Sequence, residues 1–281
     1  MVDVHTIVQC RRCRLVCVQQ APRMAHRGDY YGRMDHEAFI AYYRELRLQE
    51  ADEMLRMLNT LGVNTGRLLD VGCSYGWFLQ RAAKVGFVVT GLEPSQELAR
   101  LAREHEGLRV LVGDVTTLDT VDEQFEVIAL LDVLEHLPQP SQALALIRRR
   151  LAPGGGLLLR LPSVDGFIHR AAFGLHAASF GRIRAPLEAL AQVENDFMHL
   201  FFFSPATLKA LLAKAGFRIA HQEGCKIVET GRLKQRAQLS RQRVRYGTWE
   251  TPLMRIGLDA LQTAGRWTGI HDGLVMYATP L

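Results

Sequence analysis

Three acidic residues stand at or just beyond the ends of apolar runs: Asp70, Glu93 and Asp114. The carboxyl ends of parallel strands meet at one edge of a sheet, so these side chains should lie near one another. At such an edge Glu93 suits a bidentate grip on two ribose hydroxyls, and Asp114 can accept from an exocyclic adenine amine. Asp70 can orient the loop that follows it. Together the three describe an adenosine site without provision for a pyrophosphate.

A turn of small residues, Gly72-x-Ser74-x-Gly76, lies directly after the first of these apolar runs. The two glycines permit close backbone approach, and the helix expected after them presents free N–H groups. The same spacing also spells the serine-nucleophile elbow of α/β-hydrolases. That alternative lacks an upstream oxyanion loop and leaves Glu93 and Asp114 unexplained, so we interpret Ser74 as a turn residue.

Two histidines are candidates for moving a proton: His136, which follows the fourth apolar strand beside Glu135, and His199. A histidine with a pKa near neutrality is suited to removing a proton from a hydroxyl. Each has a plainer alternative, because His136 can stabilise the first turn of a helix and His199 can be a hydrogen-bonded core residue.

The elements that must position these residues alternate along the chain. Apolar runs separated by helical segments predict parallel strands covered on both faces, which is an α/β doubly wound sheet with right-handed crossovers. The expected helices are 35–61, 76–85, 141–151, 205–215 and 252–267, with a further one opening at Pro94-Ser95, and the expected strands are 68–71, 87–92, 108–112, 125–131, 157–161, 217–220 and 273–278. Residues 163–200 interrupt this rhythm, and an apolar stripe through Phe167, Ala171, Phe173 and Leu175 predicts a helical cap there.

From about residue 67 to 219 these motifs, in this order, resemble the class I S-adenosylmethionine-dependent methyltransferases. The further motifs are Phe125–Ile128 through Leu134–Leu137 and Leu151–Gly156. The resemblance implies a Rossmann-like, seven-stranded, mostly parallel sheet with an antiparallel last strand, and S-adenosylmethionine as methyl donor. We expect cofactor contacts from Asp70, Gly72, Ser74, Gly76, Glu93, Asp114, Val115 and Asp132. The resemblance places His136 along the wall of the cofactor pocket, and His199 stands at the end of the insertion, where a cap would meet the acceptor, so we expect a catalytic role for both.

Ser74 departs from the family, which often has glycine there, but a small side chain keeps the turn tight. The block Met198–Pro205 with Ala215-Gly216-Phe217 is similar to the branch that contains small-molecule O-methyltransferases, including those of quinone and sugar pathways. We therefore expect methyl transfer to a small-molecule or carbohydrate acceptor at oxygen. The alternatives are an RNA or protein methyltransferase, motivated by the basic run at 232–245, and a cofactor-binding protein without turnover.

The first 35 residues are rich in cysteine and arginine. The segment Cys10-Arg11-Arg12-Cys13 with Cys17 resembles the second half of a zinc ribbon that precedes the methyltransferase domain in some relatives. His5, Cys10, Cys13 and Cys17 nominally supply four ligands, but the loops between them are cramped and a first knuckle is absent. We expect a metal-free remnant, with a zinc site as the alternative.

The composition, 48% apolar and 22% charged, is that of a globular chain, and five cysteines without a secretory signal favour the cytoplasm. We expect an N-terminal segment at 1–35 and a methyltransferase domain at 36–281, with a cap-like insertion at 163–200 and an extension at 223–281. A net charge of +5 is too mild to predict nucleic-acid binding. Apolar stripes at 167–175 and 253–261 leave open a contact with a membrane surface, and core packing is the alternative.

Overall fold

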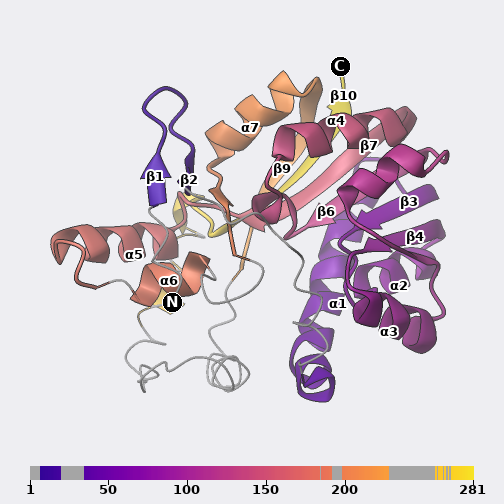
Figure 1. Ribbon diagram of the computed structural model, residues 1–281, viewed down its shortest axis with the longest axis horizontal. Helices are drawn as coiled ribbons and strands as arrows, with labels where there is room; N and C mark the ends of the chain where they lie inside the picture. The colour runs from indigo at the N-terminus through magenta and orange to yellow at the C-terminus, as the bar shows by residue number, and fades with distance from the viewer. Residues whose placement is uncertain are drawn as a thin grey trace. The chain divides into compact units, whose positions relative to one another are not determined.

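The computed structural model divides into two compact units. One holds Met1–Met24, Leu161–Ala210 and Glu223–Leu274, and the other holds Ala25–Arg160, Leu211–Gln222 and Val275–Leu281. The structure describes residues 7–19, 35–183, 185–191, 198–227, 257, 259–261, 263, 265 and 267–281. We call the units the hairpin unit and the sheet unit and describe each by itself (Figure 1).

The sheet unit is built on a seven-stranded sheet in the order β5-β4-β3-β6-β7-β10-β9. Its strands are β3 (Gly66–Val71), β4 (Phe87–Glu93), β5 (Val110–Val112), β6 (Phe125–Leu131), β7 (Leu151–Pro162), β9 (Phe217–Cys225) and β10 (Gly273–Pro280). The pairs β3–β4, β3–β6, β4–β5 and β6–β7 are parallel, and antiparallel pairing enters with the last strands. This arrangement confirms the doubly wound fold expected from the alternation of elements.

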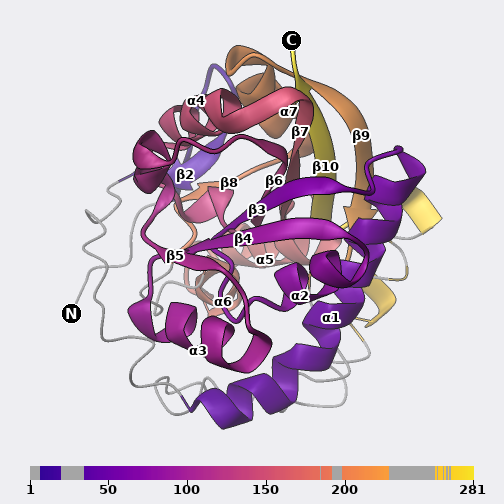
Figure 2. The ribbon, with the colours of Figure 1, turned by 90° about the vertical axis from the view of Figure 1, so that its right-hand side faces the viewer.

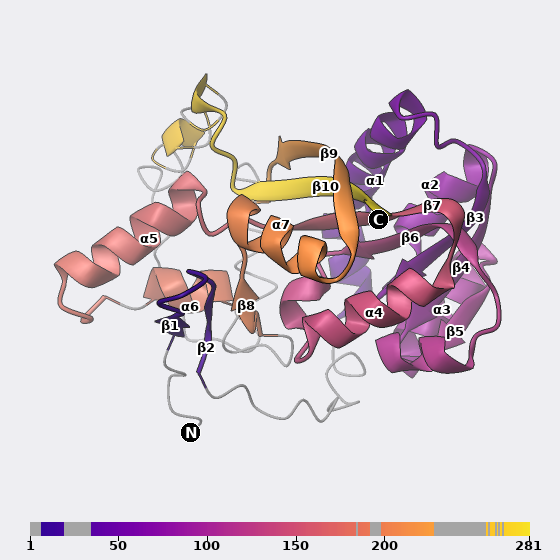
Figure 3. The ribbon, with the colours of Figure 1, turned by 90° about the horizontal axis from the view of Figure 1, so that it is seen from above.

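Helices cover both faces of this sheet. These helices are α1 (His36–Thr60), α2 (Trp77–Lys84), α3 (Gln96–Glu106) and α4 (Pro140–Arg150), with short 3-10 turns η2 (Val115–Thr120) and η3 (Leu134–His136). Helix α7 (Pro205–Lys214) is divided between the two units. The views show α1 and α2 on one face and α4 on the other (Figures 2 and 3). Because β6 is buried between these layers, its residues Val127, Ile128, Ala129 and Leu130 are fully buried, which explains the unbroken apolar run in the sequence.

Local signals in the sequence place the helix starts. Asp35 caps α1 by accepting from the N–H of Ala38 at 3.0 Å, and Ser95 caps α3 by accepting from the N–H of Leu98. Ser204 does the same for α7 through the N–H of Thr207 at 3.1 Å. Each cap satisfies one of the unpaired amides of a first helical turn.

The fifth parallel strand differs from its expected limits. We predicted a turn at Pro153–Gly156 before the strand, but β7 already begins at Leu151. The register with β6 jumps from Phe125↔Leu151 to Val127↔Gly156, so the extra residues form a bulge within the strand. Gly154 accommodates it with φ +79°.

The hairpin unit contains a three-stranded sheet of β1 (Ile7–Gln9), β2 (Val16–Val18) and β8 (Phe201–Phe202), in that order and antiparallel. Val16, Val18, Met198, Leu200 and Phe202 form its core. Two helices, α5 (Phe167–Ala178) and α6 (Ala185–Ala191), lie beside one another in this unit (Figure 1).

Helix α5 lies where we expected a helical cap, but the predicted apolar stripe on it was wrong. Ile168, His169 and Ala172 form the buried face, whereas Leu175 is 45% exposed. Both sets contain residues at i, i+4 spacing, so the spacing predicted a helix but did not decide which of its sides is buried.

No helix among the described residues is long and apolar enough to cross a membrane. Several sequence-based expectations fall outside the described residues: His5, the basic run at 232–245 and most of the helix at 252–267, including most of the stripe at 253–261.

Candidate functional site

In the turn after β3, two residues have left-handed backbone conformations that glycine adopts without strain. Gly72 and Gly76 have φ values of +78° and +77°. A Cβ on Gly72 would lie 2.7 Å from Val133, and one on Gly76 would lie 2.4 Å from Leu108. Ser74, between them, is a non-glycine residue with φ +50°. The turn is therefore tightly packed and holds one residue in a strained conformation.

Glu93, the last residue of β4, ties this turn to the next helix. Its side chain is buried, and one carboxylate oxygen accepts from the N–H of Ser74 at 2.8 Å while the other accepts from the N–H of Ser95 at 2.9 Å. Burial raises the pKa of Glu93 to about 7, against the two backbone donors, which lower it. Each oxygen keeps a second lone pair, so the pair can still accept two hydroxyl donors.

Asp70 lies on β3, next to Glu93. It is 3% exposed, and its Oδ1 has no hydrogen-bond partner among the described residues. Burial, followed by the charge of Glu93, raises the pKa of Asp70 well above its ordinary value. A buried carboxyl oxygen without a partner is costly, which is typical of a site completed by a ligand or water.

Asp114 and Val115 follow β5. The Oδ1 atom of Asp114 accepts from the N–H of Thr116 at 2.8 Å and from the Thr116 hydroxyl at 2.5 Å, so it caps η2. Val115 is buried at the start of that turn. The structure thus places both at the carboxyl end of β5, where the sequence predicted an adenine contact.

Asp132, immediately after β6, belongs to a network of four charges. Arg47 of α1 donates to Asp132 and to Glu50, both at 2.8 Å, and Arg160 of β7 donates to Glu50 at 2.5 Å and also to Asp132. The Arg160 side chain is only 4% exposed. Burial alone would raise the pKa of Asp132, but Arg160 and Arg47 outweigh it and lower that pKa. We call Arg47, Glu50, Asp132 and Arg160 the charge network.

Arg47, Glu50 and Arg160 were not among the residues that the sequence singled out. One signal was available, because Arg160 interrupts an otherwise apolar strand and a buried arginine requires an anionic partner. The partner itself was not visible, because Glu50 lies 110 positions away along the chain.

The candidate base His136 ends η3 beside Glu135. His136 is half-buried and lies close enough to Asp132 to contribute to the lowering of that residue's pKa. Glu135 is 1% exposed, and both of its carboxyl oxygens have no hydrogen-bond partner among the described residues. Burial, together with the charge of Asp132, raises the pKa of Glu135 well above its ordinary value.

The second candidate, His199, belongs to the hairpin unit. It is 5% exposed, its N–H donates to the carbonyl of Ala191 at 3.0 Å, and its ring meets Phe202 edge-on with centroids 6.2 Å apart. Within its own unit His199 is therefore a packed residue that precedes β8.

Aromatic side chains join α1 to the turn after β3, a contact that the sequence did not predict. Tyr75 stacks on Trp77 with ring centroids 4.8 Å apart and on Phe39 at 5.4 Å. The Tyr75 hydroxyl lies 2.7 Å from Nδ1 of His36. The start of α1 is thereby fixed against the turn that carries Gly72, Ser74 and Gly76.

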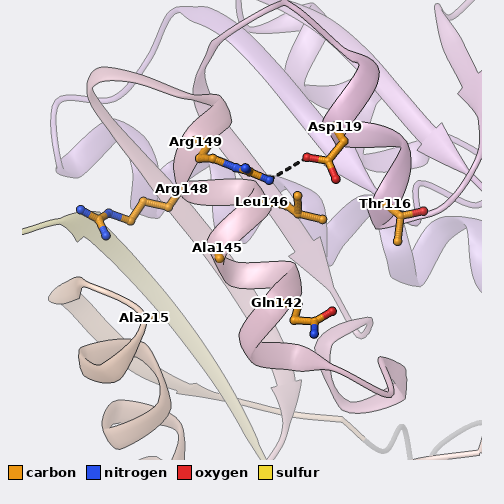
Figure 4. Close-up of a pocket in the computed structure, with 8 residues that line it drawn as sticks. All are labelled: Thr116, Asp119, Gln142, Ala145, Leu146, Arg148, Arg149 and Ala215. Atoms are coloured by element: carbon orange, nitrogen blue, oxygen red, sulfur yellow. Dashed lines mark hydrogen bonds and ion pairs between the residues drawn. The ribbon is translucent and has the colours of Figure 1, made fainter.

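A hollow of about 760 Å³ lies on the outer side of α4 (Figure 4). None of the residues predicted for the site lines it, and its Arg149 is paired with Asp119 at 2.6 Å. Its lining is Thr116, Asp119, Gln142, Ala145, Leu146, Arg148, Arg149 and Ala215. The chemistry-bearing residues of the sheet unit lie elsewhere, at the carboxyl ends of its parallel strands.

The family model described as "Methyltransferase domain" matches residues 40–222. The ubiquinone biosynthesis O-methyltransferase of Xanthomonas euvesicatoria is 29% identical over 166 residues, which cover 56% of this chain and 65% of that protein. The enzyme of the same name from Pasteurella multocida is 32% identical over 34% of this chain and 45% of its own length. The chain thus spans roughly half to two thirds of these curated relatives.

Solved structures share the fold. A Thermotoga maritima S-adenosylmethionine-dependent methyltransferase superimposes with a TM-score of 0.53 at 20% identity, covering 90% of this chain and 96% of its own. Magnesium protoporphyrin IX methyltransferase from Synechocystis, solved with bound S-adenosylmethionine, gives a TM-score of 0.55 at 13% identity, covering 94% and 99%.

Proposed function

Because this chain belongs to the methyltransferase domain family, we propose that it transfers a methyl group from S-adenosylmethionine to a hydroxyl of a small-molecule or carbohydrate acceptor. One observation carries the cofactor assignment. Glu93 is a buried carboxylate, held by two backbone N–H groups, with an unused lone pair on each oxygen. That is a receptor for a pair of neighbouring hydroxyls, as on a ribose.

The other residues at these strand ends fit the same group. The unpartnered Oδ1 of Asp70 is a buried acceptor that a ligand can complete. The N–H groups of Gly72, Ser74 and Gly76 are already bonded within the protein, and that of Ser74 donates to Glu93, so in this proposal the turn contributes by holding Glu93 in place. In this proposal Asp114 and Val115 hold the adenine, and Asp132 borders the cofactor from the end of β6.

The bound cofactor supplies an electrophilic methyl group on a sulfonium. The chain's own task is to orient an acceptor oxygen in line with that carbon and to take up the proton it releases. We assign proton removal to His136 or His199. Oxygen as the acceptor atom is supported by the names of the relatives, ubiquinone biosynthesis O-methyltransferases.

Two further assignments accompany this function. We propose the division into an N-terminal segment at 1–35 and a methyltransferase domain at 36–281, with the insertion at 163–200 as its cap and the extension at 223–281. We also place the enzyme in the cytoplasm, which is supported by its five cysteines, all free.

The test is binding of labelled S-adenosylmethionine to Glu93→Ala and to the matched variant Glu97→Ala. Glu97 is a half-exposed acid on α3 whose carboxylate pairs with Arg100, so its loss should leave binding unchanged. Loss of two charge-assisted hydrogen bonds predicts a Kd at least about 100-fold higher for Glu93→Ala.

Equal binding by both variants would overturn the assignment of Glu93, and no binding by the wild-type chain at millimolar cofactor would overturn the function. A wild-type chain that binds and forms no S-adenosylhomocysteine across an acceptor screen would contradict turnover. Product formation on RNA with a steep salt dependence would replace the small-molecule acceptor.

A further inference from the structure

The loop that follows β6 contains buried carboxyl oxygens without a partner. We call Asp132–His136 the β6 loop. Both carboxyl oxygens of Glu135 and the Oδ1 atom of Asp132 are buried and have no hydrogen-bond partner among the described residues. Burying a polar atom without a hydrogen bond costs free energy, and native proteins contain few such atoms. The β6 loop therefore holds three oxygen atoms that a ligand or water can satisfy.

The backbone of the β6 loop is both ordered and strained. Asp132 has φ +58°, an unusual value for a residue with a side chain. The N–H of His136 donates to the carbonyl of Val133 at 3.0 Å and fixes the turn between them. The loop starts at the carboxyl end of a parallel strand, which is where α/β sheets bind their ligands. Strain that the surrounding structure maintains at such a place is typical of a functional site.

Glu135 lies next to a group that the proposed reaction uses. A carboxyl oxygen of Glu135 and a ring nitrogen of His136 lie within 4.8 Å of one another. His136 is one of the two histidines to which we assign proton removal from the methyl acceptor. Two groups at this separation can each contact one of two neighbouring hydroxyls on the same molecule.

From this geometry we propose that Glu135 is a specificity residue for the methyl acceptor, because it hydrogen-bonds the hydroxyl next to the one that is methylated. The inference rests on the proposed methyl transfer and narrows its acceptor to compounds with two neighbouring hydroxyls. A hydroxyl both donates and accepts a hydrogen bond. It can therefore donate to one carboxyl oxygen of Glu135 and accept from the other when that oxygen is protonated.

A cation is the competing occupant, and the surroundings of the β6 loop disfavour it. Arg47 and Arg160 both donate to Asp132, so two positive charges already lie beside the loop. Burial, followed by the charge of Asp132, raises the pKa of Glu135 well above its ordinary value. A carboxyl group that keeps its proton attracts a cation weakly and pairs well with a hydroxyl.

The unliganded chain bears the cost of burying Glu135, and this cost can be measured. Glu135→Leu removes two unsatisfied oxygens, so it should raise the unfolding temperature. The matched variant is Glu106→Leu. The Glu106 side chain is 9% exposed, but it has partners in Arg44 and Gln80, so its loss should lower the unfolding temperature.

The experiment measures the S-adenosylhomocysteine that the whole chain forms on catechols and methyl glycosides, each compared with an analogue that lacks one neighbouring hydroxyl. Wild type should prefer the diol by at least about tenfold in kcat/KM. Glu135→Leu should lose this preference and keep the wild-type Kd for S-adenosylmethionine. Glu135→Gln retains a donor and an acceptor and should keep part of the preference, and Glu106→Leu should keep all of it.

Several outcomes would overturn the proposal. They are an unchanged diol preference in Glu135→Leu, weaker S-adenosylmethionine binding by that variant, and a lower unfolding temperature for it. Activity that a chelator abolishes and Mg²⁺ restores would also overturn it, because a cation then occupies the loop. Wild-type turnover without a diol preference contradicts this inference alone, whereas no turnover on the whole panel contradicts the proposed function as well.

Discussion

Two carboxylates of the sheet unit follow buried parallel strands, and they are held in different ways. Glu93, at the end of β4, is fixed by backbone N–H groups of Ser74 and Ser95. Asp132, after β6, is fixed by the side chains of Arg47 and Arg160. Burial raises the pKa of Glu93, whereas the two arginines outweigh burial and lower the pKa of Asp132.

The difference separates a carboxylate whose charge has no side-chain cation beside it from one whose charge two arginines balance through Oδ2. Backbone dipoles hold Glu93 without neutralising it, so a buried negative charge is left for ligand donors to stabilise. The charge of Asp132 is balanced by cations that also bind Glu50, and it therefore joins α1 to β7. On this comparison Glu93 should control cofactor affinity, and the charge network should control stability.

The largest effect should come from breaking the charge network. Arg160→Met removes a buried cation and leaves Asp132 and Glu50 sharing the half-exposed Arg47. Loss of one partner from a buried ion pair predicts a decrease of about 3–5 kcal/mol in the free energy of unfolding, measured by urea denaturation.

The matched control is Arg100→Met on α3, whose guanidinium pairs with two acids at the surface and is 49% exposed. Its cost should stay within about 0.5 kcal/mol. A loss below about 1 kcal/mol for Arg160→Met would show that the network contributes little to stability and would remove the contrast with Glu93.

An intermediate effect should appear in the pH dependence of cofactor binding. Only ionised Glu93 can accept two hydroxyl donors, and its pKa is about 7. Cofactor affinity should therefore decrease about tenfold for each pH unit below 7. Calorimetric titration at several pH values measures this slope, and Glu93→Gln should abolish it.

The unliganded chain should respond to pH in the opposite sense. Folding raises the pKa of Glu93 above its ordinary value of 4.5, so its favourable contribution is present below that value and is lost as the pH rises through about 7. The change is up to about 3 kcal/mol. If unfolding midpoints of wild type and Glu93→Gln move in parallel across this range, Glu93 is not the titrating group.

The smallest effect should come from Ser74→Gly. Ser74 has φ +50°, and its contact with Glu93 uses the backbone N–H, which glycine retains. Relief of strain predicts a gain of up to about 1 kcal/mol in the free energy of unfolding, with cofactor affinity unchanged. If Ser74→Gly lowers cofactor affinity, the Ser74 hydroxyl itself takes part in cofactor binding, which contradicts the prediction.

Much of the sheet unit could be predicted from the sequence because its signals are local. Each of these signals involves residues only a few positions apart. They are the helix caps at Asp35, Ser95 and Ser204, the glycine turn and the apolar strands. Glu93 could also be found this way, because the end of a parallel strand sets both its location and its neighbours. The buried face of α5 could not be predicted in this way. The segments that pack against α5 in its own unit, and not the pattern of the helix, decide that Ile168, His169 and Ala172 are buried.

The sequence by itself determined the doubly wound sheet and the carboxylates at its strand ends, since hydrophobic periodicity and turn chemistry are short-range. Only the tertiary structure decided how those carboxylates differ. Partners for Asp132 come from positions 47 and 160, and Tyr75 meets Phe39 and His36 across packed elements. The physical reason is that burial and ion pairing depend on which distant segments fold together, and these two quantities set the charge, the pKa and the role of each residue.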